Sequence, residues 1–258
     1  MNFSIFIIAH NESHNIADAI ASAKFADEII VVDNGSDDGT GKIALQAGAA
    51  VIRSEENLGF VEAKQLALEK CTNQWIFWLD ADERITPELS TEIEQTISSP
   101  KNFVAFKMPR KSYFLKKWIR HCGWYPDYVV RLFIRESAKF SKSLVHEKLI
   151  IDGEIGKLSS PILHYTDPTL EHYLNKFNRY TTLAAQQMYS EGKKVCLGKS
   201  VFNPPATFIR MYFLKLGFLD GMHGFLLCSL SAMYVLVKYA KLFFLKYDKE
   251  RKCPEKTS

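Results

Sequence analysis

Short apolar runs alternate with amphipathic segments along the first hundred residues. The apolar runs have the length of β-strands and cover Phe3–Ala9, Glu28–Val32, Ala49–Arg53 and Trp75–Leu79. The segments between them have helical spacing and cover Asn15–Ala23, Thr40–Ala47 and Val61–Lys70. This alternation predicts βαβ units and a mostly parallel sheet flanked by helices.

The pattern changes after about residue 102. Short apolar runs rich in aromatic residues are interrupted by turns and predict strands at Phe103–Met108, Tyr128–Ile134, Lys148–Ile151 and Ile162–Tyr165. A single helix is predicted over Glu171–Tyr189, because Pro168 stands where a helix can begin and Gly192 where one can end.

The last part of the chain is strongly apolar, from Asn203 to about Tyr247. Residues 221–237 carry no Lys, Arg, Asp or Glu. This uncharged stretch is shorter than the roughly twenty apolar residues that a membrane-spanning helix needs. Basic residues flank or interrupt the segment at Arg210, Lys215, Lys238, Lys241 and Lys246. We therefore expect a helix or hairpin in the membrane interface, with a helix packed on the protein's own core or a true transmembrane span as the alternatives.

Charge is distributed unevenly along the 258 residues. Residues 1–100 contain 6 Lys and Arg against 17 Asp and Glu, whereas residues 101–258 contain 27 against 12. The acidic first part suits chemistry with a metal cation, and the basic remainder suits an anionic partner such as phosphorylated lipid. The basic residues follow no nucleic-acid-binding module, so we expect no nucleic-acid partner.

The cysteines and the N-terminus both indicate the cytoplasm. Five cysteines, without CxxC spacing, are typical of reduced thiols. The first residues, Met1 to Ser4, contain no basic residue and do not resemble a signal peptide.

Polar clusters follow three of the four predicted parallel strands: residues 10–12, 33–40 and 80–83. Ligands of such sheets bind at the carboxyl ends of the strands, so these clusters predict one site. Asp80 and Asp82 stand two residues apart after a buried strand, and carboxylates of this kind hold Mg²⁺ or Mn²⁺ beside a diphosphate. Asp33 can accept hydrogen bonds from a nucleoside, although Asp and Ser also cap helices in ordinary βα turns.

These motifs resemble a known family. IFIIAHNESHN (5–15), VVDNGSDDGT (31–40) and WLDADE (78–83) are similar to the N-terminal motifs of family-2 glycosyltransferases. GWYPDYVVRLF (123–133), the Val145-His146-Glu147 segment and YFLKLGFLDGMHG (212–224) resemble its lipopolysaccharide-core, WaaE/KdtX-like branch. The resemblance implies an α/β GT-A fold with a C-terminal helical extension that associates with membranes.

The resemblance also implies roles for individual residues. Asn11, Glu12 and Asp33 would bind the nucleoside, Asp80 the ribose or diphosphate, and Asp82 the metal. Relatives carry a Glu-Asp pair as the catalytic base motif, whereas this chain has His146-Glu147.

An inverting transfer needs a base that takes the proton of the acceptor hydroxyl. Glu147 is our candidate for this base and Asp127 the reserve, with His146 as a candidate ligand of the metal or diphosphate. Arg131 can bind phosphate through its planar guanidinium or pair with an acidic neighbour. Trp124 and Tyr125 can stack on an acceptor sugar, or they belong to the core.

Together these observations predict an inverting, metal-dependent hexosyltransferase. The resemblance implies UDP-glucose as donor and a lipopolysaccharide inner-core acceptor at the cytoplasmic face of the inner membrane. Alternatives are transfer to a polyprenyl phosphate, capsule or protein acceptor, or a nucleotide-sugar-binding scaffold without activity. We expect a donor-binding half over residues 1–100, an acceptor-binding half over 101–167 and a helical membrane-associating region over 168–258.

Overall fold

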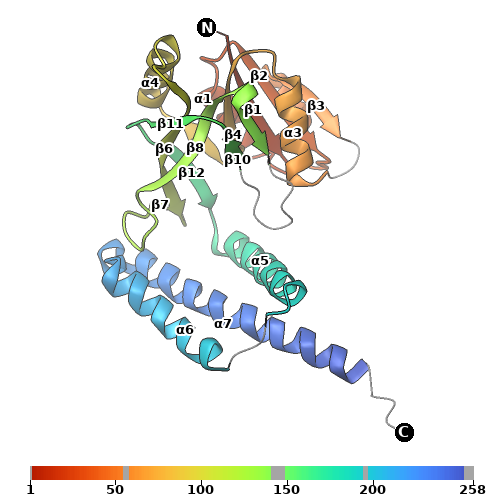
Figure 1. Ribbon diagram of the computed structural model, residues 1–258, viewed down its shortest axis with the longest axis vertical. Helices are drawn as coiled ribbons and strands as arrows, with labels where there is room; N and C mark the ends of the chain where they lie inside the picture. The colour runs from red at the N-terminus through yellow and green to blue at the C-terminus, as the bar shows by residue number, and fades with distance from the viewer. Residues whose placement is uncertain (1, 55–57, 141–148, 194–196, 253–258) are drawn as a thin grey trace. The chain divides into compact units, whose positions relative to one another are not determined.

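We describe the protein from a computed structural model (Figure 1). The structure describes residues 2–54, 58–140, 149–193 and 197–252. The chain divides into two compact units, which are described separately. The first unit comprises residues 1–111 and 126–165, and the second comprises residues 112–125 and 166–258.

The four parallel strands predicted from the sequence are present in the first unit. They are β1 (Phe3–Ala9), β2 (Glu28–Asn34), β3 (Ala50–Ser54) and β4 (Trp75–Asp80). They lie in the order β3-β2-β1-β4, and each neighbouring pair is parallel. The register places Ala9 beside Asp33 and Ile8 beside Asp80, so two acidic side chains flank the carboxyl end of β1.

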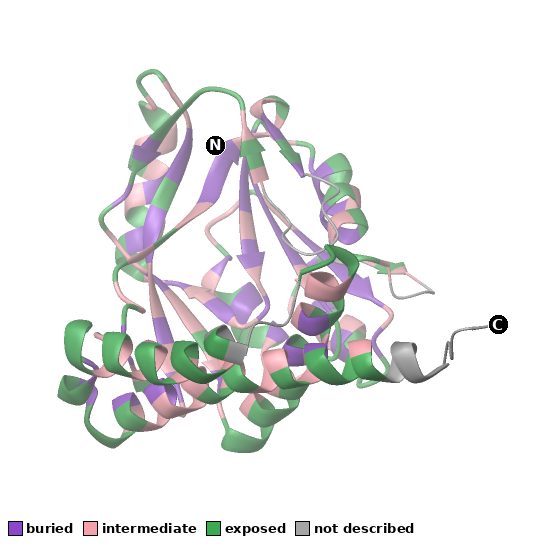
Figure 2. Ribbon diagram, turned by 60° about the horizontal axis from the view of Figure 1, so that its bottom comes forward, coloured by how far each residue is buried: buried purple, intermediate pink, exposed green. Residues whose placement is uncertain are grey.

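Both faces of this sheet are covered, which explains why its strands are apolar throughout. Four helices follow or precede the strands: α1 (Ile16–Ser22), α2 (Thr40–Gln46), α3 (Phe60–Lys70) and α4 (Pro87–Ser98). Ile5 and Ile7 of β1 share a core with residues of α1, α2 and α4, whereas Phe6 shares the opposite core with residues of α3. This alternation follows the two-residue period of a strand, and the strands are accordingly coloured as buried in Figure 2.

An antiparallel part completes the sheet. β8 (Asp127–Ile134) pairs antiparallel with β4 and with β6 (Phe103–Phe114), and β12 (Ile162–Asp167) and β5 (Glu83–Ile85) continue the order. The short elements are β7 (Lys117–Trp118), β11 (Glu154–Lys157), and a separate pair formed by β9 (Ala138–Phe140) and β10 (Leu149–Ile151). Phe77 lies opposite Leu132, so β8 brings Arg131 alongside the end of β4.

Residues 83–98 form elements that the sequence analysis did not identify, β5 and α4. The start of α4 has a clear local cause. The Thr86 side chain accepts a hydrogen bond from the backbone N–H of Leu89 (3.1 Å), and Pro87 occupies the first turn.

The second unit contains the helices of the C-terminal part. α5 (Leu170–Ser190) confirms the helix predicted there, and the backbone N–H of His172 donates to the capping hydroxyl of Thr169. The following elements are α6 (Leu197–Ile209), the π-helical turn η2 (Arg210–Leu214), the 3₁₀ turn η3 (Gly217–Asp220) and α7 (Gly221–Lys252). α7 packs against both α5 and α6.

A small core joins residues 112–125 to these helices. It contains Phe114, Ile119, Cys122, Leu227 and Cys228. Gly217 lies so close to this core that a methyl group there would be 2.9 Å from each of the two sulfur atoms, which explains the glycine. Much of the remaining helical surface is exposed, as Figure 2 shows. Judged by length and composition only, the helical segment Gly217–Tyr247 could cross a membrane.

Candidate active site

The first two polar clusters interlock at the ends of β1 and β2. The backbone N–H of Asn11 donates to Ser36 Oγ (3.0 Å), and the N–H of Asp37 donates to Asn11 Oδ1 (3.0 Å). The N–H of Glu12 donates to Thr40 Oγ1 (2.8 Å). Asn11 has a positive φ of 56°, a conformation that asparagine adopts more readily than most residues. These contacts fix the shape of the loop after β1.

Asp33 lies inside the turn that follows β2. Its side chain is buried, and Oδ1 accepts a hydrogen bond from the N–H of Ser36 (3.1 Å). A methyl group at position 41 would overlap Asp33 Oδ2, so Gly41 is required for this close approach. Asp33 therefore organises the turn in the position proposed from the sequence for nucleoside binding.

Asp80, at the end of β4, is held on both oxygens. Trp78 Nε1 donates to Asp80 Oδ1 (2.8 Å), and the Arg131 guanidinium donates to Asp80 Oδ2. The guanidinium also lies over the Trp78 ring, with its carbon 4.1 Å from the ring centroid. About a third of the Asp80 side chain is exposed (34%), so it remains accessible to a ligand.

Arg131 and Glu83 form a fully buried ion pair next to Asp80. The side chain of Glu83 is 0% exposed, Arg131 Nη2 donates to Glu83 Oε1 (2.7 Å), and the N–H of Asp80 donates to Glu83 Oε2 (3.2 Å). Burial raises the pKa of Glu83 and Arg131 partly offsets this effect. Burial disfavours the charge of Arg131, but Asp80 and Glu83 outweigh it and raise its pKa.

Asp127, the reserve candidate for the base, belongs to the same network. Arg110 donates to Asp127 Oδ2 through Nε (3.1 Å) and Nη2 (2.6 Å), and Arg110 Nη1 lies 4.0 Å from Glu83 Oε1. The side chain of Asp127 is 42% exposed. A chain of alternating charges thus extends from Asp80 to Asp127.

Asp82 has a partner that the sequence analysis did not identify. His164 Nε2 lies 3.3 Å from Asp82 Oδ2, and the N–H of Tyr165 donates to the carbonyl of Asp82 (2.8 Å). The antiparallel pairing of β12 with β5 places His164 opposite Glu83. The available sequence signal was a histidine within the otherwise apolar start of a strand.

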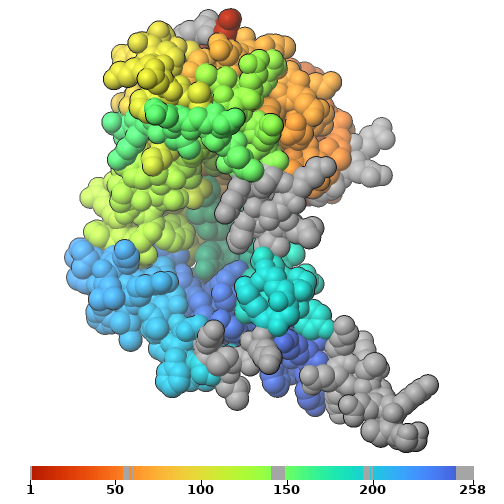
Figure 3. Space-filling model, in the orientation of Figure 1, coloured from red at the N-terminus to blue at the C-terminus, as the bar shows by residue number. Residues whose placement is uncertain are grey.

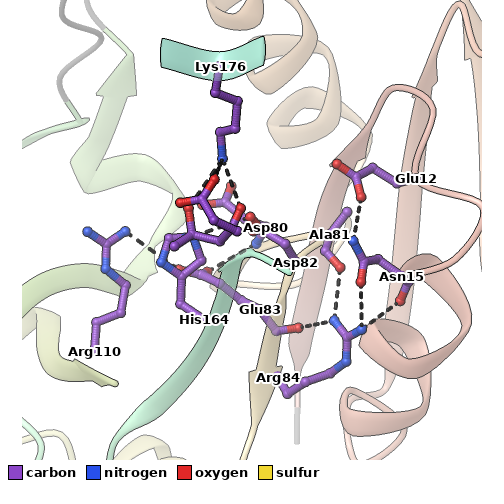
Figure 4. Close-up of polar contacts among 12 residues, drawn as sticks. Glu12, Asn15, Asp80, Ala81, Asp82, Glu83, Arg84, Arg110, His164 and Lys176 are labelled. Carbon is purple, nitrogen blue, oxygen red and sulfur yellow. Dashed lines mark hydrogen bonds and ion pairs between the residues drawn. The ribbon is translucent and has the colours of Figure 1, made fainter. Parts of the chain in front are cut away.

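Arg84 connects the third polar cluster to the first (Figure 4). Its Nη1 donates to the carbonyl of Ala81 (2.9 Å), and its Nη2 donates to the carbonyl of Asn15 (3.0 Å). Asn15 Nδ2 in turn donates to Glu12 Oε2 (2.7 Å). The structure thus joins the three polar clusters into one constellation, as expected from the sheet.

The donors near Asp82 fit a hard divalent cation. A carboxylate suits Mg²⁺ or Mn²⁺ when phosphate oxygens complete the coordination. Among the described residues, no group of three His, Cys, Asp or Glu side chains gathers as a complete metal site. Asp82 and the adjacent His164 are described side chains with the donor atoms that such a site needs.

Four further candidates from the sequence are not part of the network described above. Trp124 and Tyr125 lie in the second unit, where Trp124 packs edge-on against Phe114 and Tyr125 packs edge-on against Trp118. His146 and Glu147 lie outside the described residues.

Comparison with known proteins identifies the family. Residues 4–148 match the glycosyl transferase family 2 domain. The chain belongs to glycosyltransferase family 2. The sheet order described above, with four parallel strands followed by an antiparallel part, is the GT-A-like fold expected for such a protein.

Relatives of this glycosyltransferase cover nearly the whole chain. It is 30% identical over 251 residues to the lipopolysaccharide core biosynthesis glycosyltransferase LpsC of Rhizobium meliloti, covering 93% of this chain and 91% of LpsC. It is 31% identical over 258 residues to an uncharacterised glycosyltransferase of Rickettsia prowazekii, covering 93% and 86% of the two chains.

Solved structures with some similarity include two bacterial proteins. One is TarS from S. aureus, with a TM-score of 0.49 and 14% identity over 96% of this chain and 92% of that one. Another is glucosyl-3-phosphoglycerate synthase from Mycobacterium tuberculosis in complex with Mn²⁺, UDP-glucose and phosphoglyceric acid, with a TM-score of 0.37 and 25% identity over 42% and 43%.

The buried ion pair of this glycosyltransferase leads to a stability prediction. Arg131→Met should lower the free energy of unfolding by about 3–5 kcal/mol, because Glu83 would remain buried without its counter-charge. Urea unfolding followed by tryptophan fluorescence measures the change.

Two further variants make this test specific. The double variant Arg131→Met/Glu83→Gln should recover part of the loss, since the unpaired charge is gone, and the exposed Lys139→Met should change stability little. A double variant whose loss equals the sum of the losses in Arg131→Met and in the single variant Glu83→Gln would show that the pair is not coupled.

Proposed function

We propose that the protein is an inverting hexosyltransferase that moves glucose from UDP-glucose onto a lipopolysaccharide inner-core acceptor. The observation that carries this proposal is the placement of Asp33 and Asp80 on either side of the end of β1, within a glycosyltransferase family 2 domain. The similarity to LpsC supports the choice of a lipopolysaccharide-core acceptor.

The loops after β1, β2 and β4 would bind the donor. We assign Asn11, Glu12 and Asp33 to the nucleoside and Asp80 to the ribose or diphosphate. Arg131 supports this role by fixing the orientation of Asp80 and compensating its charge. A carboxylate that is already oriented loses less conformational freedom when the ligand binds.

We further propose that Asp82 holds a Mg²⁺ or Mn²⁺ ion, with His164 beside it and the donor diphosphate completing the coordination. When bound, such a cation neutralises the charge that develops on the departing diphosphate. His146 is a further candidate for this position.

The transfer itself requires one proton acceptor. We propose that the carboxylate of Glu147 takes the proton of the acceptor hydroxyl while that oxygen forms a bond to the anomeric carbon. The bond from the anomeric carbon to the diphosphate breaks on the opposite side, and the diphosphate leaves with the electron pair. Asp127 is the reserve, although Arg110 already occupies one of its oxygens.

We propose that residues 101–167 bind the acceptor and that residues 168–258 contact the membrane. Trp124 and Tyr125 would contact the acceptor sugar, and the exposed apolar helices would keep the enzyme at the cytoplasmic face of the inner membrane. A lipid-linked glycan is the acceptor chemistry that suits such a location.

A donor-hydrolysis screen tests the proposed activity. We expect UDP-glucose to be consumed in preference to other nucleotide sugars, with Mn²⁺ or Mg²⁺ but not with EDTA, and faster when a lipopolysaccharide-core acceptor is added. Turnover of no donor with any metal would favour a nucleotide-sugar-binding scaffold instead. Turnover that only a polyprenyl phosphate, capsule or protein acceptor accelerates would contradict the assigned acceptor.

Asp82→Ala should abolish metal-dependent binding of the donor. Titration calorimetry of UDP with and without Mn²⁺ measures this, and Asp152→Ala, at an exposed aspartate of the first unit, is the matched control. The control should bind as the native protein does. Native-like, Mn²⁺-dependent affinity in Asp82→Ala would remove this residue from the site.

Glu147→Gln should retain affinity for the donor and lose transfer by a factor of about 10²–10⁴, the usual effect of losing a general base. Rates with saturating donor, compared with donor affinity from calorimetry, separate the two effects. Near-normal turnover in Glu147→Gln together with a comparable loss in Asp127→Asn would move the role to Asp127.

A further inference from the structure

The turn between α6 and α7 exposes an unusual concentration of large apolar side chains. We call these residues the apolar tip, and each is at least 44% exposed: Ile209, Phe213, Leu214, Leu216, Phe218, Leu219, Met222 and Phe225. They occur within the 17 positions from 209 to 225. Figure 3 shows α6 and α7 side by side, in shades of blue. Exposed apolar side chains that gather on one surface mark an interaction site.

The apolar tip is held in its exposed conformation by its own backbone. The N–H of Lys215 donates to the carbonyl of Arg210 (2.8 Å), and the N–H of Cys122 donates to the carbonyl of Lys215 (2.9 Å). A methyl group on Gly224 would overlap the carbonyl oxygen of Gly217, so the chain packs closely behind the tip. These contacts therefore hold the backbone of the turn in place.

The charged residues in the sequence around the tip are mostly basic. Residues 197–247 contain six Lys and Arg and one acidic residue, Asp220. Asp220 is buried, and its carboxylate accepts hydrogen bonds from the backbone N–H groups of Arg120 (3.3 Å) and His121 (2.8 Å). Arg210 and Lys215, by contrast, are exposed within the tip.

This combination identifies the partner by its chemistry. Exposed apolar side chains together with the exposed cations Arg210 and Lys215 fit the interface of a bilayer, where acyl chains lie beneath anionic headgroups. A second copy of the tip fits less well, because it would bring like charges together.

Lys241 of α7 contacts the carbonyl and Oδ1 of Asn178 (2.9 and 2.7 Å) and Thr181 Oγ1 (2.8 Å) of α5, so α7 is bound into the helical unit.

We propose that the apolar tip inserts into the headgroup region of an anionic bilayer, with Arg210 and Lys215 contacting lipid phosphates. This inference rests on the proposed membrane location and adds the residues that make the contact. Lys241 is excluded from the contact, since its ammonium group is already satisfied within the unit.

Vesicle sedimentation with the full-length protein tests the proposal. The native protein should sediment at low salt with phosphatidylcholine vesicles containing phosphatidylglycerol, but much less with phosphatidylcholine alone. Phe213→Asp/Leu214→Asp should weaken this binding at least tenfold, since each buried apolar side chain contributes that order of affinity. Arg210→Glu/Lys215→Glu should weaken it by a similar factor and reduce its sensitivity to salt.

The matched control is Leu45→Asp, at an exposed leucine of the first unit, which should bind vesicles as the native protein does. Donor hydrolysis and circular dichroism of each variant verify folding independently of lipid. If the native protein sediments with neither kind of vesicle, the proposed membrane location itself is contradicted.

The remaining outcomes concern the tip alone. Native-like vesicle binding by Phe213→Asp/Leu214→Asp would overturn the tip inference and leave the membrane location standing. Light scattering could instead show that the native protein is a dimer and that Phe213→Asp/Leu214→Asp is a monomer. If neither protein then binds vesicles, the partner of the tip is a second copy of the chain, and the tip inference is overturned.

Discussion

The guanidinium of Arg131 supplies a positive charge in the interior of the first unit, beside the acidic loop that follows β4. Glu83 is fully buried there, and Asp80 is bound on one oxygen by the same guanidinium. Carboxylates removed from water need such a partner, because desolvation is otherwise costly. Arg131 belongs to the antiparallel strand β8, so the conformation of the acidic loop depends on a strand that follows some fifty residues later.

The parallel part of the fold and two sides of the site were predictable because their signals are local. The apolar runs of β1, β2 and β4 end directly before polar residues, and parallel strands bring those ends together. Helix α4 was not predicted, although Thr86 and Pro87 mark its start. Its signal is also local and was present in the sequence.

The partners of these local motifs could not be predicted in the same way. From the sequence, the partner of Arg131 could be either a phosphate or an acidic side chain. The antiparallel register of β8 with β4 places Arg131 against Asp80 and Glu83. The pairing of His164 with Asp82 likewise depends on the register of β12 with β5. Pairings between distant strands follow from tertiary packing, for which a single sequence gives no direct signal.

The second unit is discontinuous in sequence, and this affects how the protein can be divided. Residues 112–125 share a core with α7, and the Asp220 carboxylate binds the backbone of this segment. A fragment that ends before α5 would keep Phe114, Ile119 and Cys122 but lose the helices that cover them. Such a fragment would thus expose these apolar side chains to solvent. A chimera that exchanges the helical unit must exchange residues 112–125 with it.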